Sequence, residues 1–481
     1  MKRILLTALL ICAGIGSVTS QTLYKDSPIL PKNKIKMTRG QAVVCPGLHD
    51  DHFSIVHAQD FIRKARSARS QVTKKSQFIV TYFNFPEEAK ASFQRAVEIW
   101  EYLVHSEVPI RVFASWEPLG ANVLGQATAS DFLSVFEGSH YVNTFYPIAL
   151  AEKLAGQPLN SDNDGDIYCW FSSSINWHYG EPENIRPGTF DFTTVVLHEL
   201  GHGLGFLSSM TVSGQTANYG FGTPLKTVYD RYVENGGGSN LVDTTVFKRN
   251  SQALFRELTG NNLYFERGSG SERPRLFAPS TFSPSASIAH LDDSTYPNGT
   301  LNALMTSTAR TMEVTHDPGP LTLSALHEMG WKSTTIVHEP LKSFPQNTPV
   351  TFKAKILSDT TLKAGSVKLY YQTSGGVVTV NLAQVPGTNE YKTDVTFPSS
   401  VTEVLYFFEA QDNFGKTVRT PGNNGMNDQQ YVYGFRFGTD VAGPTVIHNP
   451  LSIEDVGYPK IFMAFAEDDF QDGLASVNLS Y

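Results

Sequence analysis

The stretch F-T-T-V-V-L-H-E-L-G-H-G-L-G-F, residues 192–206, decides the fold of the central part of the chain. It contains the pattern H-E-x-x-H between His198 and His202. In a helix, four residues advance by about 400° and rise by about 6 Å, so the two histidines lie one turn apart on one face. Both imidazoles can then reach one Zn²⁺ ion, with Glu199 flanking the metal. From there Glu199 can act as the general base for a metal-activated water.

The same pattern also occurs in ordinary helices, whose histidines lie on a solvated face or in the core. Its surroundings favour the metal-binding interpretation, because residues 194–197 are an apolar approach that suits a buried helix. Gly205, three residues beyond His202, can take a left-handed conformation and end the helix sharply. Such an ending frees the chain to bring a third ligand to the open side of the metal.

Composition and charge exclude several classes of protein. The chain has 481 residues, enough for about two to four domains, and 41% hydrophobic residues suffice for packed cores. A net charge of −8 argues against nucleic acid as a partner. No long apolar run follows the N-terminus, so we expect no transmembrane segment.

The first twenty residues are typical of a signal peptide. Lys2 and Arg3 precede an apolar stretch at 4–15, and small residues at 18–20 suit a cleavage site. The alternative is a buried N-terminal helix. A signal peptide over 1–20 predicts a secreted, extracellular protein.

Residues 21–75 are polar and contain a basic cluster between positions 63 and 75. We interpret them as a pro-segment with an exposed processing junction, although a solvated helix face would look the same. After removal of the signal peptide, Cys45 and Cys169 remain, which allows one disulfide. Unpaired buried thiols are an alternative, and so is a Cys45 that ligates the zinc until the pro-segment is cut away.

Hydrophobic spacing predicts the elements before the H-E-x-x-H helix. We expect strands at 78–83, 108–116 and 167–171, the last one exposed beside the zinc helix, where a peptide substrate can add as a further strand. We expect helices from Pro86 to about residue 104 and over 146–154.

Two segments before and after the H-E-x-x-H helix have distinctive compositions. The acidic turn at 162–166 could bind Ca²⁺, but its spacing departs from the EF-hand loop and favours a solvated turn before a strand. Residues 208–284 are rich in Gly, Ser and Asn, with loops at 235–240 and 267–271, and we interpret them as an insertion before the segment that completes the site.

The third zinc ligand is not fixed by the motif itself. Catalytic zinc sites take three protein ligands and keep one position open. The elongated pattern H-E-x-x-H-x-x-G-x-x-H is matched through Gly205, but Ser208 stands at its last position. The third ligand must therefore lie elsewhere, and His178, His316 and Glu257 are candidates by residue type.

Two later stretches carry a resemblance to a known family. S-I-A-H-L-D at 287–292 precedes N-A-L-M-T at 302–306, and with the H-E-x-x-H helix they resemble the metzincin zinc metalloproteases. Within these the chain is similar to the leishmanolysin-like group and its secreted bacterial relatives, in which a long insertion delays the third histidine. The resemblance implies that His290 is the third zinc ligand and that Met305 is the Met-turn residue packed beneath the metal. It extends over residues 76–332, but no tyrosine follows two residues after Met305, and Tyr296 is a weak candidate for that role.

The tail beyond residue 332 alternates apolar and polar residues over short runs. Strands at 350–356, 367–371 and 404–408 predict an immunoglobulin-like β-sandwich over 333–436. A repeat supports a modular tail, because 336–341 resembles 446–451 and 366–371 resembles 476–481 at the same spacing. We therefore expect 437–481 to begin a second, incomplete sandwich, with the chain a fragment or truncated. His338 and His448 begin the two copies, so we interpret them as structural.

The sequence as a whole predicts an α+β protein, with a zinc protease domain at 76–332 followed by all-β repeats. We expect a secreted zinc endopeptidase in which His198, His202 and His290 bind Zn²⁺ and Glu199 is the base. Its partners would be protein or peptide substrates, and the tail would bind surfaces or substrates. The alternatives are a non-catalytic zinc-binding adhesin with a protease-like fold, which would have no need of Glu199, and a thermolysin-like zinc site with an acidic third ligand.

Overall fold

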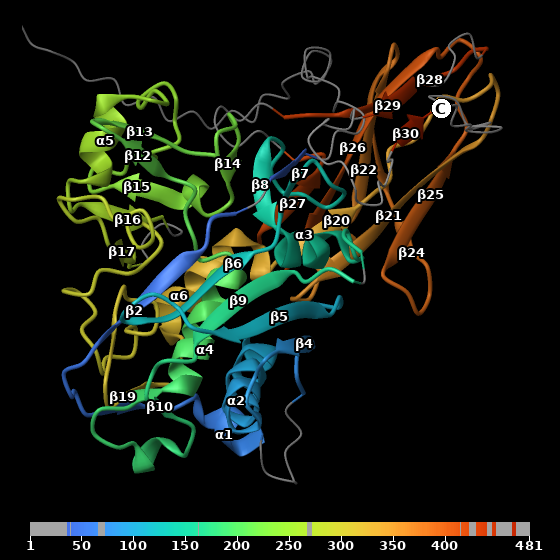
Figure 1. Ribbon diagram of the computed structural model, residues 1–481. Helices are drawn as coiled ribbons and strands as arrows, with labels where there is room; N and C mark the ends of the chain where they lie inside the picture. Colours follow the sequence, from blue (N-terminus) through green and yellow to red (C-terminus); the bar gives the residue numbers. More distant parts are fainter. Residues whose placement is uncertain are drawn as a thin grey trace, which may run out of the picture.

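The chain mixes helices and strands in an α+β arrangement (Figure 1). The computed structural model describes residues 36–38, 40–65, 73–161, 163–266, 272–413, 415–422, 430–439, 445–448 and 464–467. The expected signal peptide lies outside these residues. No helix in the described ranges is both long and apolar enough to cross a membrane. The helices are α1 (Asp60–Ala65), α2 (Glu87–Leu103), α3 (Ile148–Ala155), η1 (Pro182–Asn184), α4 (Phe192–Gly203), η2 (Asp230–Tyr232), α5 (Gln252–Leu258), α6 (Gly319–Leu326) and η3 (His327–Trp331).

The strands fall into a larger set before residue 332 and a smaller set in the tail. The first set is β1 (Lys36–Thr38), β2 (Val43–Leu48), β3 (Ser54–Val56), β4 (Phe78–Phe83), β5 (Ile110–Glu117), β6 (Val123–Ala129), β7 (Phe132–Ser134), β8 (Thr144–Pro147), β9 (Ile167–Ser172), β10 (Trp177–His178), β11 (Phe190–Asp191), β12 (Thr211–Ser213), β13 (Thr216–Asn218), β14 (Lys226–Thr227), β15 (Val233–Asn235), β16 (Leu263–Phe265), β17 (Arg275–Leu276), β18 (Ala309–Arg310) and β19 (Glu313–Thr315). The tail contains β20 (Thr334–Val337), β21 (Val350–Ser358), β22 (Lys368–Thr373), β23 (Gly376–Asn381), β24 (Ala383–Gln384), β25 (Glu390–Val395), β26 (Glu403–Gln411), β27 (Thr417–Thr420), β28 (Tyr433–Arg436), β29 (Thr445–His448) and β30 (Ala464–Glu467).

A six-stranded sheet with the order β18-β2-β6-β9-β5-β4 organises the first part of the chain. Strands β4, β5 and β9 are parallel, whereas β6 runs antiparallel to β9 and to β2. Helix α4 packs against α2 and β6, because both helices present apolar faces; on α2 this face carries Phe93, Val97 and Trp100. The strands expected at 78–83, 108–116 and 167–171 and the helix from Pro86 are confirmed within one or two residues.

One expectation about this sheet is wrong. Strand β9 is not an exposed edge, because β5 and β6 pair with its two sides. The helix expected over 146–154 is confirmed within two residues as α3; it begins at Ile148 because the preceding residues form β8 and Pro147 holds an extended conformation at the helix start.

The N-terminal segment forms three strands that pair with strands from later parts of the chain. Strand β1 pairs with β7, β2 lies between β6 and β18, and β3 pairs with β19. Val43 and Cys45 point into the core. The pro-segment expected at 21–75 therefore contains strands that pair within the fold. In the basic cluster, where the exposed junction was expected, Arg63, Lys64, Lys74 and Lys75 are exposed, and residues 66–72 lie outside the described residues.

The expected insertion at 208–284 consists of short elements on one side of the main sheet (Figure 1). Strands β12 and β13 form a hairpin, β15 to β17 form a three-stranded sheet, and α5 contacts β13. The loop expected at 235–240 is present as a turn closed by the Asn235 side chain, and the loop expected at 267–271 lies outside the described residues.

The tail consists of two sheets that share one core. One has the order β20-β21-β25-β24, and the other is built on β23-β22-β26-β27 with β28 also paired to β26. Phe352 of the first sheet packs against Tyr406 and Phe435 of the second. His338 is structural, as expected, because its ring contacts the Lys353 carbonyl and the Tyr406 hydroxyl. The expected second copy contributes the paired strands β29 and β30.

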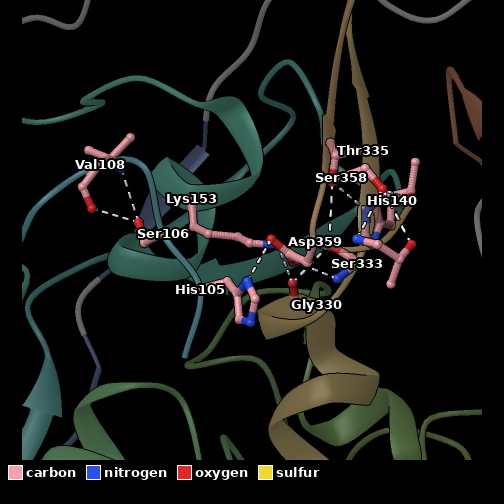
Figure 2. A network of polar contacts seen from close by, with 12 residues as sticks. His105, Ser106, Val108, His140, Lys153, Gly330, Ser333, Thr335, Ser358 and Asp359 are labelled. Carbon is pink, nitrogen blue, oxygen red and sulfur yellow. Dashed lines mark hydrogen bonds and ion pairs between the residues drawn. The ribbon is translucent and has the colours of Figure 1, made fainter. Parts of the chain in front are cut away.

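A buried polar network joins the tail to the first part of the chain (Figure 2). Lys153 of α3 donates to the Gly330 carbonyl at 2.8 Å, to Ser333 Oγ at 2.9 Å and to the Asp359 carboxylate at 2.7 Å. His105 lies 3.4 Å from the same carboxylate. Because Asp359 follows β21 and Lys153 lies on α3, this network joins the tail to helix α3.

Candidate metal centre

Helix α4 is held at both ends and along its length. At its start the Asp191 carboxylate accepts hydrogen bonds from the Thr194 backbone N–H and hydroxyl, both at 2.7 Å, which caps the helix. At its end Gly205 has a φ of 110°, so the chain turns away as expected. The indole N–H of Trp100 donates to the Leu197 carbonyl, which ties α4 to α2. All of α4 is buried, so its polar side chains need partners within the protein or a ligand.

His198, His202 and His290 converge on one point. The Nε2 atom of His202 lies 2.9 Å from Nε2 of His198 and 3.2 Å from Nε2 of His290. The other ring nitrogen of each histidine faces a backbone carbonyl. The Nδ1–H of His198 donates to the Leu304 carbonyl at 2.6 Å. That of His202 donates to the Phe206 carbonyl at 2.7 Å, and that of His290 to the Ala286 carbonyl at 2.9 Å.

These contacts define the charge state of the three rings. Burial lowers the pKa of His198 to about 3 and that of His290 to about 4, so both rings are neutral at neutral pH. With each Nδ1 protonated on a carbonyl, each Nε2 carries a bare lone pair, and three lone pairs at such distances repel one another. A cation at their centre removes this repulsion, and the carbonyls would orient the rings as they do around protein-bound metals. The cluster therefore fits a metal ion.

Met305 packs against Gly201 of α4, the helix that carries His198 and His202. Met305 is fully buried, and a Cβ atom on Gly201 of α4 would lie only 2.8 Å from its sulfur. The backbone of this segment is also engaged, because the Met305 carbonyl accepts from Leu291, next to His290. The segment 302–306 therefore contacts α4, which carries His198 and His202, and also the segment that carries His290.

Glu199 lies beside the cluster without a protein partner. Its side chain is fully buried, burial raises its pKa, and neither carboxylate oxygen has a hydrogen-bond partner within the described part of the chain. Gly125 of β6 makes room for it, since a Cβ there would lie 2.9 Å from Glu199 Oε1. Gly125 was not predicted from the sequence. A glycine inside a strand can indicate that another group approaches the backbone closely at that position.

Cys45 of β2 approaches the same point. Its sulfur, a ring nitrogen of His198 and a carboxylate oxygen of Glu199 lie within 4.8 Å of one another. Cys45 and Cys169 are both free and buried, so the disulfide is excluded in favour of unpaired thiols. Cys45 is therefore placed beside the candidate metal centre by a strand of the N-terminal segment.

The other candidate ligands lie elsewhere. His316 pairs with the Asp191 carboxylate at 2.8 Å, and His178 contacts the Glu181 carbonyl at 2.9 Å. Glu257 lies on α5, in the insertion. Tyr296 accepts a hydrogen bond from the Arg275 backbone, so its hydroxyl is engaged away from the histidines. His178, His316 and Glu257 belong to no group of potential metal ligands in the described ranges.

The acidic turn is only partly described, because Asp162 lies outside the described residues. Asp166 is buried, and its carboxylate accepts from the Asn160 side chain at 2.8 Å and from the Arg111 backbone at 2.7 Å. These protein donors engage both of its oxygens. The turn is anchored at this residue by hydrogen bonds, and Ca²⁺ binding there stays a prediction.

Comparison with known proteins gives one finding. The sequence model of the SPBPB7E8-like family matches residues 89–266, and no curated protein matches the chain. The matched range includes His198, Glu199 and His202 and ends before His290.

Proposed function

We propose that this chain is a secreted zinc-dependent endopeptidase. The observation that carries the proposal is the convergence of three buried imidazole Nε2 atoms beside a buried carboxylate that has no protein partner. Three neutral imidazoles are a usual ligand set for catalytic zinc, and they leave a fourth position open. In this proposal residues 76–332 adopt a metzincin-like fold of the leishmanolysin-like type, and 333–436 adopt an immunoglobulin-like one.

Each residue then has a defined task. His198, His202 and His290 would hold the ion, and Zn²⁺ in such a site supplies a Lewis acid that activates water for attack on a carbonyl. Glu199 accepts the proton of that water and donates it to the leaving amine. Burial favours this role, since the raised pKa of Glu199 makes it a stronger base than a solvated carboxylate.

Strand β6 is the proposed docking edge for a peptide substrate. Its Gly125 lies against Glu199, so a strand that pairs with the side of β6 opposite β9 would pass over the reacting groups. Strand β2 occupies that side, pairing antiparallel with β6 from Val43 to Pro46. A peptide can use the same backbone groups once β2 is displaced. Residues 21–75 therefore act as a pro-segment in this proposal, with Cys45 as a candidate zinc ligand in the uncut form.

The test is zinc content measured together with casein cleavage. We expect one zinc per chain, with activity that appears after limited trypsin digestion at the basic cluster between 63 and 75. The Glu199→Ala variant should keep the zinc and lose the activity. Bound zinc without cleavage in the digested wild-type protein would instead favour the zinc-binding adhesin.

A further inference from the structure

Strand β4 ends the six-stranded sheet on the side opposite β18 (Figure 1). In the described part of the chain it pairs with β5 alone, in a parallel register over residues 78–83. The candidate metal centre lies toward the other end of the sheet, where β2 carries Cys45. The second edge of β4 is therefore separate from the proposed catalytic groups.

The hydrogen bonds at the start of β4 show which of its residues face this second edge. The Gln77 carbonyl accepts from β5 at 2.9 Å, whereas the Phe78 N–H donates to the Glu101 carboxylate at 3.0 Å. In a parallel ladder alternate residues face the same neighbour, so Val80 and Tyr82 direct their N–H and C=O groups away from β5. These four backbone groups have no hydrogen-bond partner among the residues that the structure describes.

The sequence of β4 does not protect this edge. Residues 78–83 read F-I-V-T-Y-F, without a charge, a proline or a glycine. Natural sheet edges usually carry charges, prolines or bulges, because unpaired N–H and C=O groups take up other strands. Ile79 and Phe83 are 45% and 44% exposed, and Phe83 packs edge-on against Phe113 of β5. The edge therefore combines unpaired backbone groups with an apolar surface beside them.

A second copy of the chain can pair with this edge about a two-fold axis. The first N–H of β4 is already engaged, so the antiparallel register that uses the four remaining groups places Val80 of one copy opposite Tyr82 of the other. Each of these two pairs exchanges two hydrogen bonds. Thr81 then lies opposite Thr81 on the axis, and Ile79 lies opposite Phe83. The same register thus pairs the exposed apolar side chains with one another.

The charges at the two ends of β4 fit this arrangement. Lys74 and Lys75 precede the strand, and Glu87 and Glu88 follow it at the start of α2; all four are exposed, although Lys74 and Glu87 also form pairs within their own chain. Antiparallel pairing brings the basic end of one copy to the acidic end of the other, so opposite charges meet at both ends. Parallel pairing would bring like charges together.

We propose that this protein forms a homodimer through antiparallel pairing of β4 with β4, which joins the two six-stranded sheets into one. The contact uses the second edge of β4 in both copies, so assembly stops at two chains. The inference is independent of the proposed endopeptidase function, because β4 supplies none of the candidate metal ligands among the described residues. In the joined sheet both β2 strands lie toward the outer ends, so the contact leaves both candidate metal centres accessible.

The first test measures the mass of the full-length protein by analytical ultracentrifugation. We expect a dimer that dissociates on dilution. Ile79→Lys combined with Phe83→Lys places like charges on both sides of the contact and should raise the dissociation constant roughly 100-fold. Val246→Lys combined with Leu301→Lys is the matched control, because it adds the same charge at side chains that are 52% and 48% exposed. A monomeric wild-type protein would overturn the proposal, as would equal weakening in the control or oligomers that keep growing with concentration.

The second test locates the contact. Thr81 is exposed, whereas Cys45 and Cys169 are free but buried. Thr81→Cys should give a disulfide-linked dimer with oxidised glutathione, because directly opposed side chains in a pair without backbone hydrogen bonds come close enough for a disulfide. Val246→Cys should give no such link. A wild-type dimer that Thr81→Cys does not link would use another surface and would reject the β4 pairing.

Discussion

Gly125 sets the position of the proposed general base. Its missing side chain leaves the space that Glu199 occupies, since a Cβ there would lie 2.9 Å from Oε1 and 3.0 Å from Cγ. Because α4 is packed on both sides, the carboxylate would have to shift to accommodate a methyl group.

We therefore expect Gly125→Ala to lower kcat by roughly 100-fold, the usual effect of a misplacement near 1 Å. Zinc content should stay at one per chain, because the atoms nearest to a Cβ on Gly125 belong to Glu199 and not to the three histidines. Gly120→Ala is the matched control, since the nearest atom to a Cβ there lies at 3.5 Å. Loss of zinc in Gly125→Ala would contradict this account.

Substitution of His290 tests which histidines bind the zinc ion. Its Nε2 faces that of His202 at 3.2 Å, whereas His316 is committed to Asp191. We expect His290→Ala to bring the zinc content from one per chain to near zero, and His316→Ala to retain zinc. Metal analysis after dialysis measures both variants, and the reverse order would reject the histidine triad.

At the scale of elements, the cap of α4 links helix stability to pH. Burial raises the pKa of Asp191, but the charge of His316 and hydrogen bonds from His316 and Thr194 lower it further than burial raises it. A depressed pKa in the folded state adds stability above the unfolded value of about 3.9, and this gain is lost as the pH falls through the folded pKa.

Asp191→Asn keeps a capping oxygen but removes the charge. We expect it to cost about 1–3 kcal/mol at pH 7, the value of hydrogen bonds to a charged group. The difference from wild type should shrink as the pH falls below about 4, because the Asp191 carboxylate of the unfolded chain begins to take up a proton there while the folded one stays ionised to a lower pH. Urea unfolding at pH 7 and pH 3 measures it, and a gap that persists unchanged at pH 3 would exclude this linkage.

The elements differ in how far the sequence reveals them. Helix α2 has a clear helical period, and α4 carries the H-E-x-x-H pattern with an apolar approach before it and Gly205 beyond it, so both follow from the local sequence. Strand β6, with the sequence V-L-G-Q-A-T-A, has weak strand propensity, and β2 contains Pro46 and Gly47, so neither was expected. Strand β9 was found but wrongly given a free edge, because alternation along one strand does not reveal its neighbours. His290 is one of the three converging histidines, yet only family resemblance, and no local period, pointed to it.

At the scale of the whole molecule, the junction between the tail and the first part depends on a buried ion pair. The Lys153 side chain is 7% exposed and that of Asp359 15%, and burial lowers the pKa of Lys153. The network in Figure 2 gives each charge several partners.

Asp359→Asn should cost about 3–5 kcal/mol, because it leaves Lys153 buried without a counter-charge. Lys153→Met combined with Asp359→Asn should cost less than the two single variants together. Glu87→Gln, which breaks the exposed pair with Lys90, is the control and should cost about 1 kcal/mol or less. Chemical unfolding of the full chain measures all four variants, and strict additivity would show that the pair is not coupled.

The pairing of N-terminal strands with strands from much later in the sequence affects how the chain folds. Strands β2 and β3 find their parallel partners β18 and β19 more than two hundred residues later in the sequence. Such distant pairings make folding slow, and they form only after the intervening chain has been synthesised. Until then the edges of β2 and β3 that later pair with β18 and β19 can take up other extended chains, so the nascent protein is most prone to aggregate in the interval before residues 309–315 emerge.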